Sequence, residues 1–290
     1  MPLLRPTCAA LVVGLLVACG DASAPPAAPP AAPPVFPSPV IHATRPVIVV
    51  THTLASMATP PGYDGRWRTV APGIDLMRLQ GRSNDFDELL IVARVDVKLA
   101  DLRVLYDPQA PRTARDWQAD TGAALVVNGG FFDEQYRATG LLISDGQPFG
   151  RSYRGFGGMF SLRAGQPLLQ WLRTHPYRFD PAIEQAVQGF PMLVVAGQRV
   201  EGITDNGQRN RRTFIALDRD GRVLLGVTQI AQWTLTDLAD FLAASPALGV
   251  VHALNLDGGA SSGLWLGGGH DHLSMNSFDP VPAVIAIFGR

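Results

Sequence analysis

The sequence predicts a single α+β domain, rich in strands, behind a targeting segment and a proline-rich tether. Hydrophobic residues make up 47% of the 290 residues and charged residues 17%, which allows a large core. Short apolar runs alternate with glycine turns, as expected for hairpins. Two segments carry the apolar spacing of an amphipathic helix, so we also expect a few packed helices.

Residues 1–18 are predicted to be a lipoprotein signal peptide. Arg5 supplies a positive charge, and the apolar stretch 8–17 is too short to span a bilayer as a permanent helix. Leu16-Val17-Ala18-Cys19 resembles the lipobox of bacterial lipoproteins, which implies cleavage before Cys19 and acylation of its thiol. The alternative is an ordinary secretory peptide. We therefore expect an exported protein, anchored in the bacterial cell envelope by a lipid.

Residues 19–46 are dominated by alanine and proline and have no periodic apolar face, so they are expected to form a disordered, semi-rigid tether. Gly20 stands where aspartate commonly retains lipoproteins in the inner membrane, which favours the outer membrane and periplasm. We expect the folded domain to span 47–290, with its core at about 70–290. The formal net charge of −1 argues against a nucleic-acid partner.

The predicted elements follow in chain order. We expect strands at 89–96, 124–127, 214–218, 222–228 and 249–254, and helices at 113–119 and 234–244. Gly122 is the expected stop of the first helix, and Thr234 or Thr236 the expected cap of the second. Asp220-Gly221 suits a type I′ hairpin turn. Asp145-Gly146, Ala164-Gly165 and Ala196-Gly197 separate apolar runs in the same way.

The segment Asn255-Leu256-Asp257-Gly258-Gly259-Ala260-Ser261-Ser262 is the strongest candidate for a site. It follows an apolar strand, and glycines there let a ligand approach the backbone. Asp257 is the expected catalytic carboxylate, because a carboxyl at a strand end can act as a base, nucleophile or metal ligand. Asn255 points to the same strand face. A carboxylate that only caps its own turn is the alternative.

A second candidate is Asn128-Gly129-Gly130-Phe131-Phe132, which also follows an apolar strand. Successive glycine N–H groups can form an anion-binding nest, and Asn128 adds an amide. A plain turn is the alternative. The repeated pattern of strand, polar residue and Gly-Gly predicts that Asn128 and Asp257 lie together beside one cleft. Arg212 precedes a hairpin strand, from which a guanidinium can bind phosphate or carboxylate.

These motifs appear in the order seen in the phosphodiester glycosidase family, which the chain resembles over about residues 70–290. The motifs that carry the resemblance are Asn128 to Phe132, Gly140 to Gly146, Gly189 to Val194, Arg212 to Ala216 and Asn255 to Ser262. The sequence departs from the family at Ala260, where a third glycine is common, and at Phe214, where a small residue is usual.

The resemblance implies hydrolysis of a sugar-1-phosphodiester in an envelope or extracellular glycan. It assigns catalysis to Asp257, Asn128 and Arg212, with Arg212 and the amides of Gly129 and Gly130 on the phosphate. The remaining residues, which would bind substrate or shape the turn, are Asn255, Gly258, Gly259, Ser261 and Ser262. Asp133 or Glu134 is the candidate for a second carboxylate, and whether one completes a pair, and hence retention or inversion, is open. No cofactor is expected, and dependence on a divalent metal is open. The rival function is a non-catalytic lipoprotein that binds an anionic glycan or serves as a scaffold in exopolysaccharide assembly.

Overall fold

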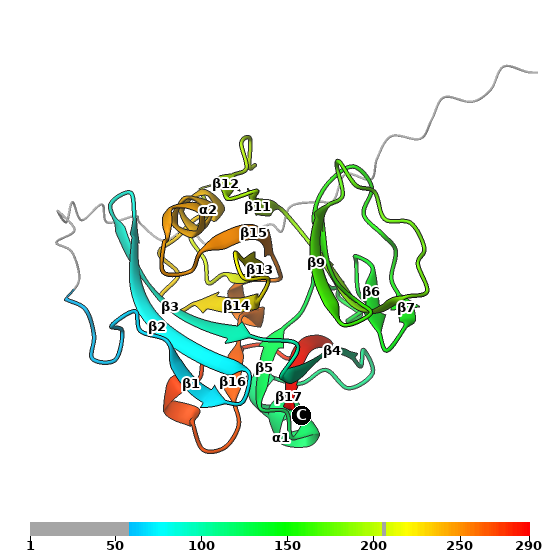
Figure 1. The fold of residues 1–290 in the computed structure, drawn as a ribbon, viewed down its shortest axis with the longest axis horizontal. Coiled ribbons are helices and arrows are strands. Elements are labelled where there is room, and N and C mark those ends of the chain that lie inside the picture. The colour runs from blue at the N-terminus through cyan, green and yellow to red at the C-terminus, as the bar shows by residue number, and fades with distance from the viewer. Residues whose placement is uncertain (1–57, 205–206) are drawn as a thin grey trace, which may run out of the picture. The chain divides into compact units, whose positions relative to one another are not determined.

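The computed structural model describes residues 58–204 and 207–290, all within the second of two units of the chain, Met1–Thr51 and His52–Arg290. The expected signal peptide, the tether and the start of the expected domain lie outside the described residues. The described part contains three sheets and two α-helices, which confirms the predicted strand-rich α+β class (Figure 1). None of its helices is long and apolar enough to cross a membrane.

Every neighbouring pair of strands in the three sheets is antiparallel. The largest sheet has the order β1-β2-β3-β14-β13-β15-β11-β12. Its strands are β1 (Arg68–Ala71), β2 (Ile74–Ser83), β3 (Phe86–Val95), β11 (Met192–Val195), β12 (Gln198–Arg199), β13 (Thr213–Asp218), β14 (Val223–Thr228) and β15 (Val250–Asn255).

Two smaller sheets complete the β-structure. The first, ordered β7-β6-β10-β8-β9, contains β6 (Leu142–Ser144), β7 (Gln147–Phe149), β8 (Gly158–Arg163), β9 (Gln166–Trp171) and β10 (Ile183–Gly189). The second, ordered β16-β5-β17-β4, contains β4 (Ala100–Tyr106), β5 (Leu125–Asn128), β16 (Leu264–Leu266) and β17 (Ala283–Gly289). Short 3-10 helices lie at Gly259–Ser261 and Asp271–Leu273.

Both predicted helices are present and begin where their caps indicate. Helix α1 (Ala114–Thr121) starts after Thr113, whose hydroxyl accepts the Asp116 N–H, and it ends at Gly122 in the left-handed conformation (φ 66°). Helix α2 (Leu235–Ala244) starts with a capping box between Thr234 and Asp237.

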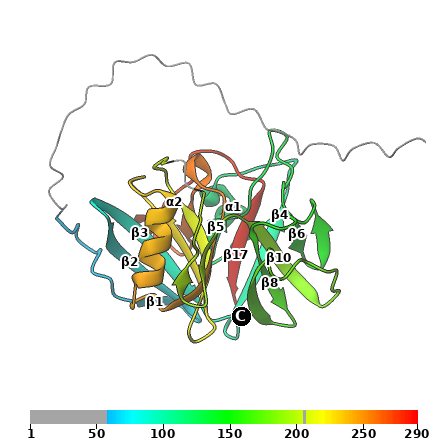
Figure 2. The same ribbon diagram turned by 90° about the horizontal axis from the view of Figure 1, so that it is seen from above.

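The main core lies among the three sheets, and strand alternation divides the side chains between its two sides. Leu125 and Val127 of β5 join this core, whereas Val126 packs with Trp117 of α1 on the outer face. Helix α2 covers the outer face of the largest sheet, where it packs mainly against β2, β11, β12 and β15 (Figure 2). The described unit is thus held together by apolar burial on both faces of two sheets.

One of the four predicted glycine turns, Asp220-Gly221, does not have the expected type I′ geometry. Asp220 does not adopt a positive φ, while Gly221 does (φ 75°), and Asp218 N–H donates to the Arg222 carbonyl. The predicted type I′ turn is therefore wrong, because the longer loop places a single left-handed glycine before β14. In the other three hairpins both turn residues have positive φ: Asp145-Gly146, Ala164-Gly165 and Ala196-Gly197. These pairs directly join consecutive strands, as type I′ geometry requires.

Candidate active site

The two glycine-bearing strand ends meet, although their strands belong to different sheets. Asn128 ends β5, and its Nδ2 donates to the Asp257 backbone carbonyl at 2.7 Å. Asn128 Oδ1 accepts from Thr213 Oγ1 at 2.8 Å and from the Gly263 N–H at 3.1 Å. The Asn128 side chain is fully buried, so it connects three segments and exposes no atom to a substrate. This geometry makes Asn128 a positioning residue for the Asp257 loop.

Thr213 and Ser262 extend this buried polar cluster. Their hydroxyl oxygens lie 3.0 Å apart, and both side chains are inaccessible to solvent. Ser262, expected near substrate, therefore supports the loop from behind. Thr213 was not among the predicted site residues, although it stands in the Arg-Thr motif next to Arg212. Buried hydroxyls of this kind rigidify a site because every donor and acceptor has a partner.

The glycines at the strand ends serve close backbone packing. A Cβ on Gly129 would lie 3.0 Å from the Ala283 carbonyl oxygen, and one on Gly130 would lie 2.7 Å from that of Gln188. The Gly129 N–H already donates to the Ala283 carbonyl at 2.9 Å. The interpretation of this amide as part of an anion nest is therefore wrong, because the protein itself occupies it.

Asp257 is the one acid of the predicted motif, and its carboxyl is largely buried. Oδ1 accepts the Gly258 N–H at 3.0 Å, and the Ser261 hydroxyl donates to the same carboxyl. Burial raises the pKa of Asp257 to about 6, with a smaller contribution from the negative Asp279, while the bonds from Ser261 and Gly258 oppose the rise. At pH 7 the carboxyl is therefore mostly ionised, yet close to a pH at which it can hold a proton.

A tyrosine that sequence reasoning missed lies close enough to Asp257 for their charges to interact. Burial raises the pKa of the Tyr153 phenol, and the Asp257 charge raises it further. The Tyr153 hydroxyl lies 3.0 Å from Thr139 Oγ1. A neutral phenol beside an ionisable carboxyl is a hydrogen-bond donor at the site. No strand or motif signal marks Tyr153 in the sequence, because it stands in an irregular segment between β7 and β8.

The second carboxylate expected at Asp133 or Glu134 is not the acid that influences Asp257. Asp133 Oδ2 accepts from Arg137 Nε at 2.9 Å, and its Oδ1 accepts the N–H groups of Gln135 and Arg137. These bonds lower the pKa of Asp133, the backbone bond from Arg137 most of all. Asp133 is thereby engaged in its own turn.

The two adjacent arginines are in different environments. Arg212 Nη2 donates to the Gln208 carbonyl at 2.6 Å, and its Nε to the Trp233 carbonyl at 3.4 Å. Arg211 is 7% exposed, and its Nη2 donates to the Asn276 carbonyl at 3.1 Å. Arg211 Nε and Nη1 are buried and have no acceptor among the described residues. The Arg211 carbonyl accepts the Gly259 N–H at 2.8 Å, so this residue borders the Asp257 loop.

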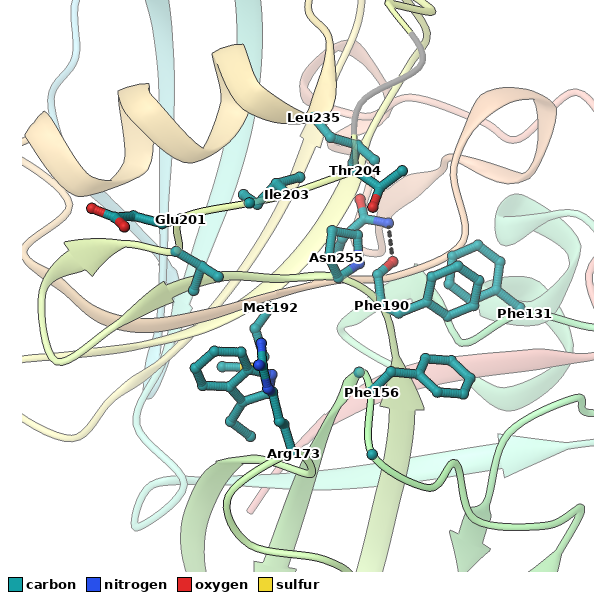
Figure 3. A pocket seen from close by; sticks show the side chains of 16 residues that line it. Phe131, Phe156, Arg173, Phe190, Met192, Glu201, Ile203, Thr204, Leu235 and Asn255 are labelled. Carbon is teal, nitrogen blue, oxygen red and sulfur yellow. Dashed lines mark hydrogen bonds between the residues drawn. The ribbon is translucent and has the colours of Figure 1, made fainter.

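A cleft of about 500 Å³ opens beside the loop at Asn255 (Figure 3). Asn255 Nδ2 donates to the Phe190 carbonyl at 2.8 Å, whereas its buried Oδ1 has no donor among the described residues. Aromatic rings from separate segments line the cleft, and Figure 3 shows Phe131, Phe156 and Phe190 grouped on one side. Such a cavity is of the size and apolar character typical of ligand sites.

The described residues contain no group of three or more histidine, cysteine, aspartate or glutamate side chains placed to hold a metal ion. The rings of His270 and His272 lie 6.4 Å apart in the loop that precedes the last strand. The site described above is thus built from one carboxyl, a buried amide and hydroxyl cluster, a phenol and an arginine.

Comparison with solved structures finds a similar fold in other proteins. The catalytic domain of zebrafish N-acetylglucosamine-1-phosphodiester alpha-N-acetylglucosaminidase, described as auto-inhibited by its pro-peptide, has a similar structure. It is 16% identical, with a TM-score of 0.59, and the match covers 77% of this chain and 86% of that chain. A hypothetical protein from Synechocystis is 18% identical, with a TM-score of 0.54, and the match covers 75% of this chain and 62% of that one.

At these identities the two structures show a shared fold. No curated protein matches the chain. Residues 121–288, more than half of the chain, match the phosphodiester glycosidase model. This match includes both strand ends that meet at Asn128 and Asp257. The chain therefore belongs to the phosphodiester glycosidase family.

Proposed function

We propose that this protein hydrolyses the bond between the anomeric carbon of a sugar and a phosphodiester in an envelope or extracellular glycan. The observation that carries the proposal is Asp257, a largely buried carboxyl with a pKa raised to about 6. Perturbed carboxyls of this kind are typical of acid–base and nucleophilic catalysis. Family membership supports the same reaction class.

Asp257 acts in its ionised form, either as a base toward water or as a nucleophile. In the first route it takes a proton as the water oxygen bonds to the anomeric carbon. In the second its own oxygen bonds to that carbon, and water then releases the sugar. Both routes break the bond between the anomeric carbon and the phosphate oxygen, and the phosphate departs as a monoester. This leaving group is a stable anion, so strong acid help is not required.

The neighbouring residues have separate roles in this proposal. Asn128 and Ser262 fix the loop, and Ser261 orients the carboxyl. The Tyr153 phenol donates a hydrogen bond to the substrate. Preorganised groups of this kind lower the barrier because they need no rearrangement during reaction.

Phosphate binding is assigned to the arginine pair, with Arg211 supplying the uncommitted donors. Its Nε and Nη1 lack acceptors among the residues that the structure describes, and a phosphate oxygen would provide them. The Phe278 ring covers the guanidinium, with its centroid 4.3 Å from Arg211 Cζ, and is itself 76% exposed. Access to the guanidinium therefore involves displacement of this exposed ring.

The proposed location is the bacterial cell envelope, with Cys19 acylated and the outer membrane and periplasm favoured. The lipobox sequence and Gly20 support it. The prediction concerns residues outside the described part, and its test is biochemical.

The reaction is tested with purified protein and a panel of sugar-1-phosphodiesters that differ in sugar and anomer. Phosphorus NMR reports the appearance of a phosphate monoester, and sugar analysis reports the free reducing end. We expect wild-type protein to release both and Asp257→Asn to release both about a hundredfold or more slowly. Binding of an anionic glycan without cleavage of any diester would instead support the non-catalytic lipoprotein.

A further inference from the structure

The cleft includes Asn255, two residues before Asp257, and aromatic side chains form much of its lining. It is lined by Phe131 after β5, Phe156 before β8, Trp171 at the end of β9 and Phe190 after β10. Four segments distant in sequence thus bring aromatic rings to one cavity. Phe156 and Phe190 are 49% and 39% exposed. Exposed aromatic side chains gathered in this way mark a binding surface.

Three of the rings pack against one another. Phe131 and Phe190 stack with their centroids 4.4 Å apart, and Phe156 meets Phe190 edge-on at 5.8 Å. Trp171 lies beside the Arg173 guanidinium, 5.7 Å from ring centroid to Cζ. A rigid aromatic wall requires little ordering on binding, which favours affinity.

The polar group in the cleft decides what kind of ligand fits. Asn255 is 5% exposed, and its Oδ1 has no hydrogen-bond donor among the described residues. An alkyl chain filling the cleft would leave this acceptor buried and unpaired, which is unfavourable. A ligand with hydroxyl groups satisfies it and also places C–H surfaces against the rings. Arg173, exposed at the cleft, adds donors for further oxygens.

We infer that this cleft binds a further saccharide ring of the substrate. The inference rests on the proposed function. The substrate is then an oligosaccharide or polysaccharide phosphodiester, and not a single sugar phosphate esterified with a small or purely apolar alcohol. Asn255 has a sugar hydroxyl as its partner, and Phe156 and Trp171 contact the ring faces.

The test compares four diesters built on the sugar 1-phosphate that the activity panel identifies. Three carry methanol, decanol or mannobiose on the phosphate, and the fourth is a methyl diester whose sugar is extended by one residue. We expect at least one saccharide-extended diester to exceed the parent methyl diester in kcat/KM by roughly tenfold or more. Phe156→Ala and Trp171→Ala should bring that ratio close to one. Phe179→Ala, an exposed aromatic outside the cleft, is the matched control and should keep the ratio.

A gain with decanol alone, or with neither saccharide extension, overturns the inference. An equal loss of the ratio in Phe179→Ala also overturns it. If wild-type protein cleaves no diester, the proposed reaction fails, and the cleft is tested separately by saturation-transfer NMR with maltotriose, mannotriose and chitotriose. Binding of one trisaccharide that is lost in Trp171→Ala supports the saccharide site, and binding of none refutes it.

Discussion

Replacement of Asp257 by asparagine tests two effects of the carboxyl separately: its effect on the free energy of unfolding and its effect on catalysis. Asparagine keeps the side-chain shape and an oxygen for the Gly258 N–H, but it cannot ionise. Burial raises the pKa of Asp257 from its ordinary value of 3.8 to about 6 in the folded protein. The folded state therefore binds more protons than the unfolded state between these two pH values.

The sign of the effect on stability follows from this difference. The free energy of unfolding falls as pH rises from about 3.8 to 6, because folding must then desolvate a charge. The loss is about 3 kcal/mol, at about 1.4 kcal/mol for each unit of pKa. Asp257→Asn lacks this loss, so its stability relative to wild type should increase between pH 4 and pH 7 and then stay constant.

Urea unfolding of both proteins at several pH values measures the difference directly. The activity of the same proteins provides the second reading. Wild-type kcat/KM should fall about tenfold per pH unit below pH 6, because a protonated carboxyl neither accepts a proton nor attacks carbon. The variant should lose about two orders of magnitude or more in kcat. If the free energies of unfolding of the two proteins change with pH in the same way, Asp257 does not carry a buried charge. If kcat is unchanged in the variant, Asp257 is not the catalytic residue.

Four other substitutions test the remaining assignments. Asn128→Ala should destabilise the protein by about 1–3 kcal/mol in urea unfolding and lower kcat with little change in KM, since it leaves buried partners unpaired; a change confined to KM would point to direct substrate contact. Arg211→Lys should raise KM by about tenfold or more, and Arg212→Lys less, because an ammonium cannot form the guanidinium fork; the reverse order would return the phosphate to Arg212. Cys19→Ser should release the protein from the membrane fraction and remove lipid from its N-terminus by mass spectrometry, and unchanged fractionation would contradict the anchor.

Local signals in the sequence were sufficient for the elements that local chemistry controls. Gly122 ends α1, as predicted, and Thr234, one of the two predicted caps, begins α2. The turn at Asp220-Gly221 was wrong in type because hairpin geometry depends on where the strand pairing ends, which a dipeptide does not reveal.

Phe214 stands where the family usually has a small residue. Tertiary packing, which a local sequence pattern does not reveal, explains this difference. Phe214 is fully buried on β13 and pairs across the ladder with Gly226 of β14. A Cβ on Gly226 would lie 2.2 Å from the Phe214 ring, so the glycine provides the room that a larger side chain needs. Two residues separated in sequence thus compensate one another in volume.

Arg211 and Arg212 show a similar limit within the site. The sequence presents adjacent guanidinium groups that differ in nothing local, and only the fold distinguishes them. Arg212 donates to the carbonyls of Gln208 and Trp233, whereas Arg211 is enclosed next to the Asp257 loop, and its Nε and Nη1 have no acceptor in the described part of the chain. Because burial, not residue type, decides which donors remain available, the motif alone does not distinguish Arg212, the residue expected from the sequence, from Arg211, the phosphate ligand we now propose.

The paired glycines in the sequence indicated where the site lies. The structure explains them by close backbone packing, and not by the anion-binding nest expected from the sequence. At Gly129 and Gly130 the absence of a Cβ lets β5 approach the carbonyls of Ala283 and Gln188. That approach brings Asn128 within 2.7 Å of the Asp257 carbonyl, across the boundary between two sheets. A fully bonded amide then holds the backbone of Asp257, whose carboxyl has a pKa raised to about 6. Close packing at the end of β5 thereby holds the Asp257 loop after β15 in place. A rigid scaffold positions a catalytic group in this way.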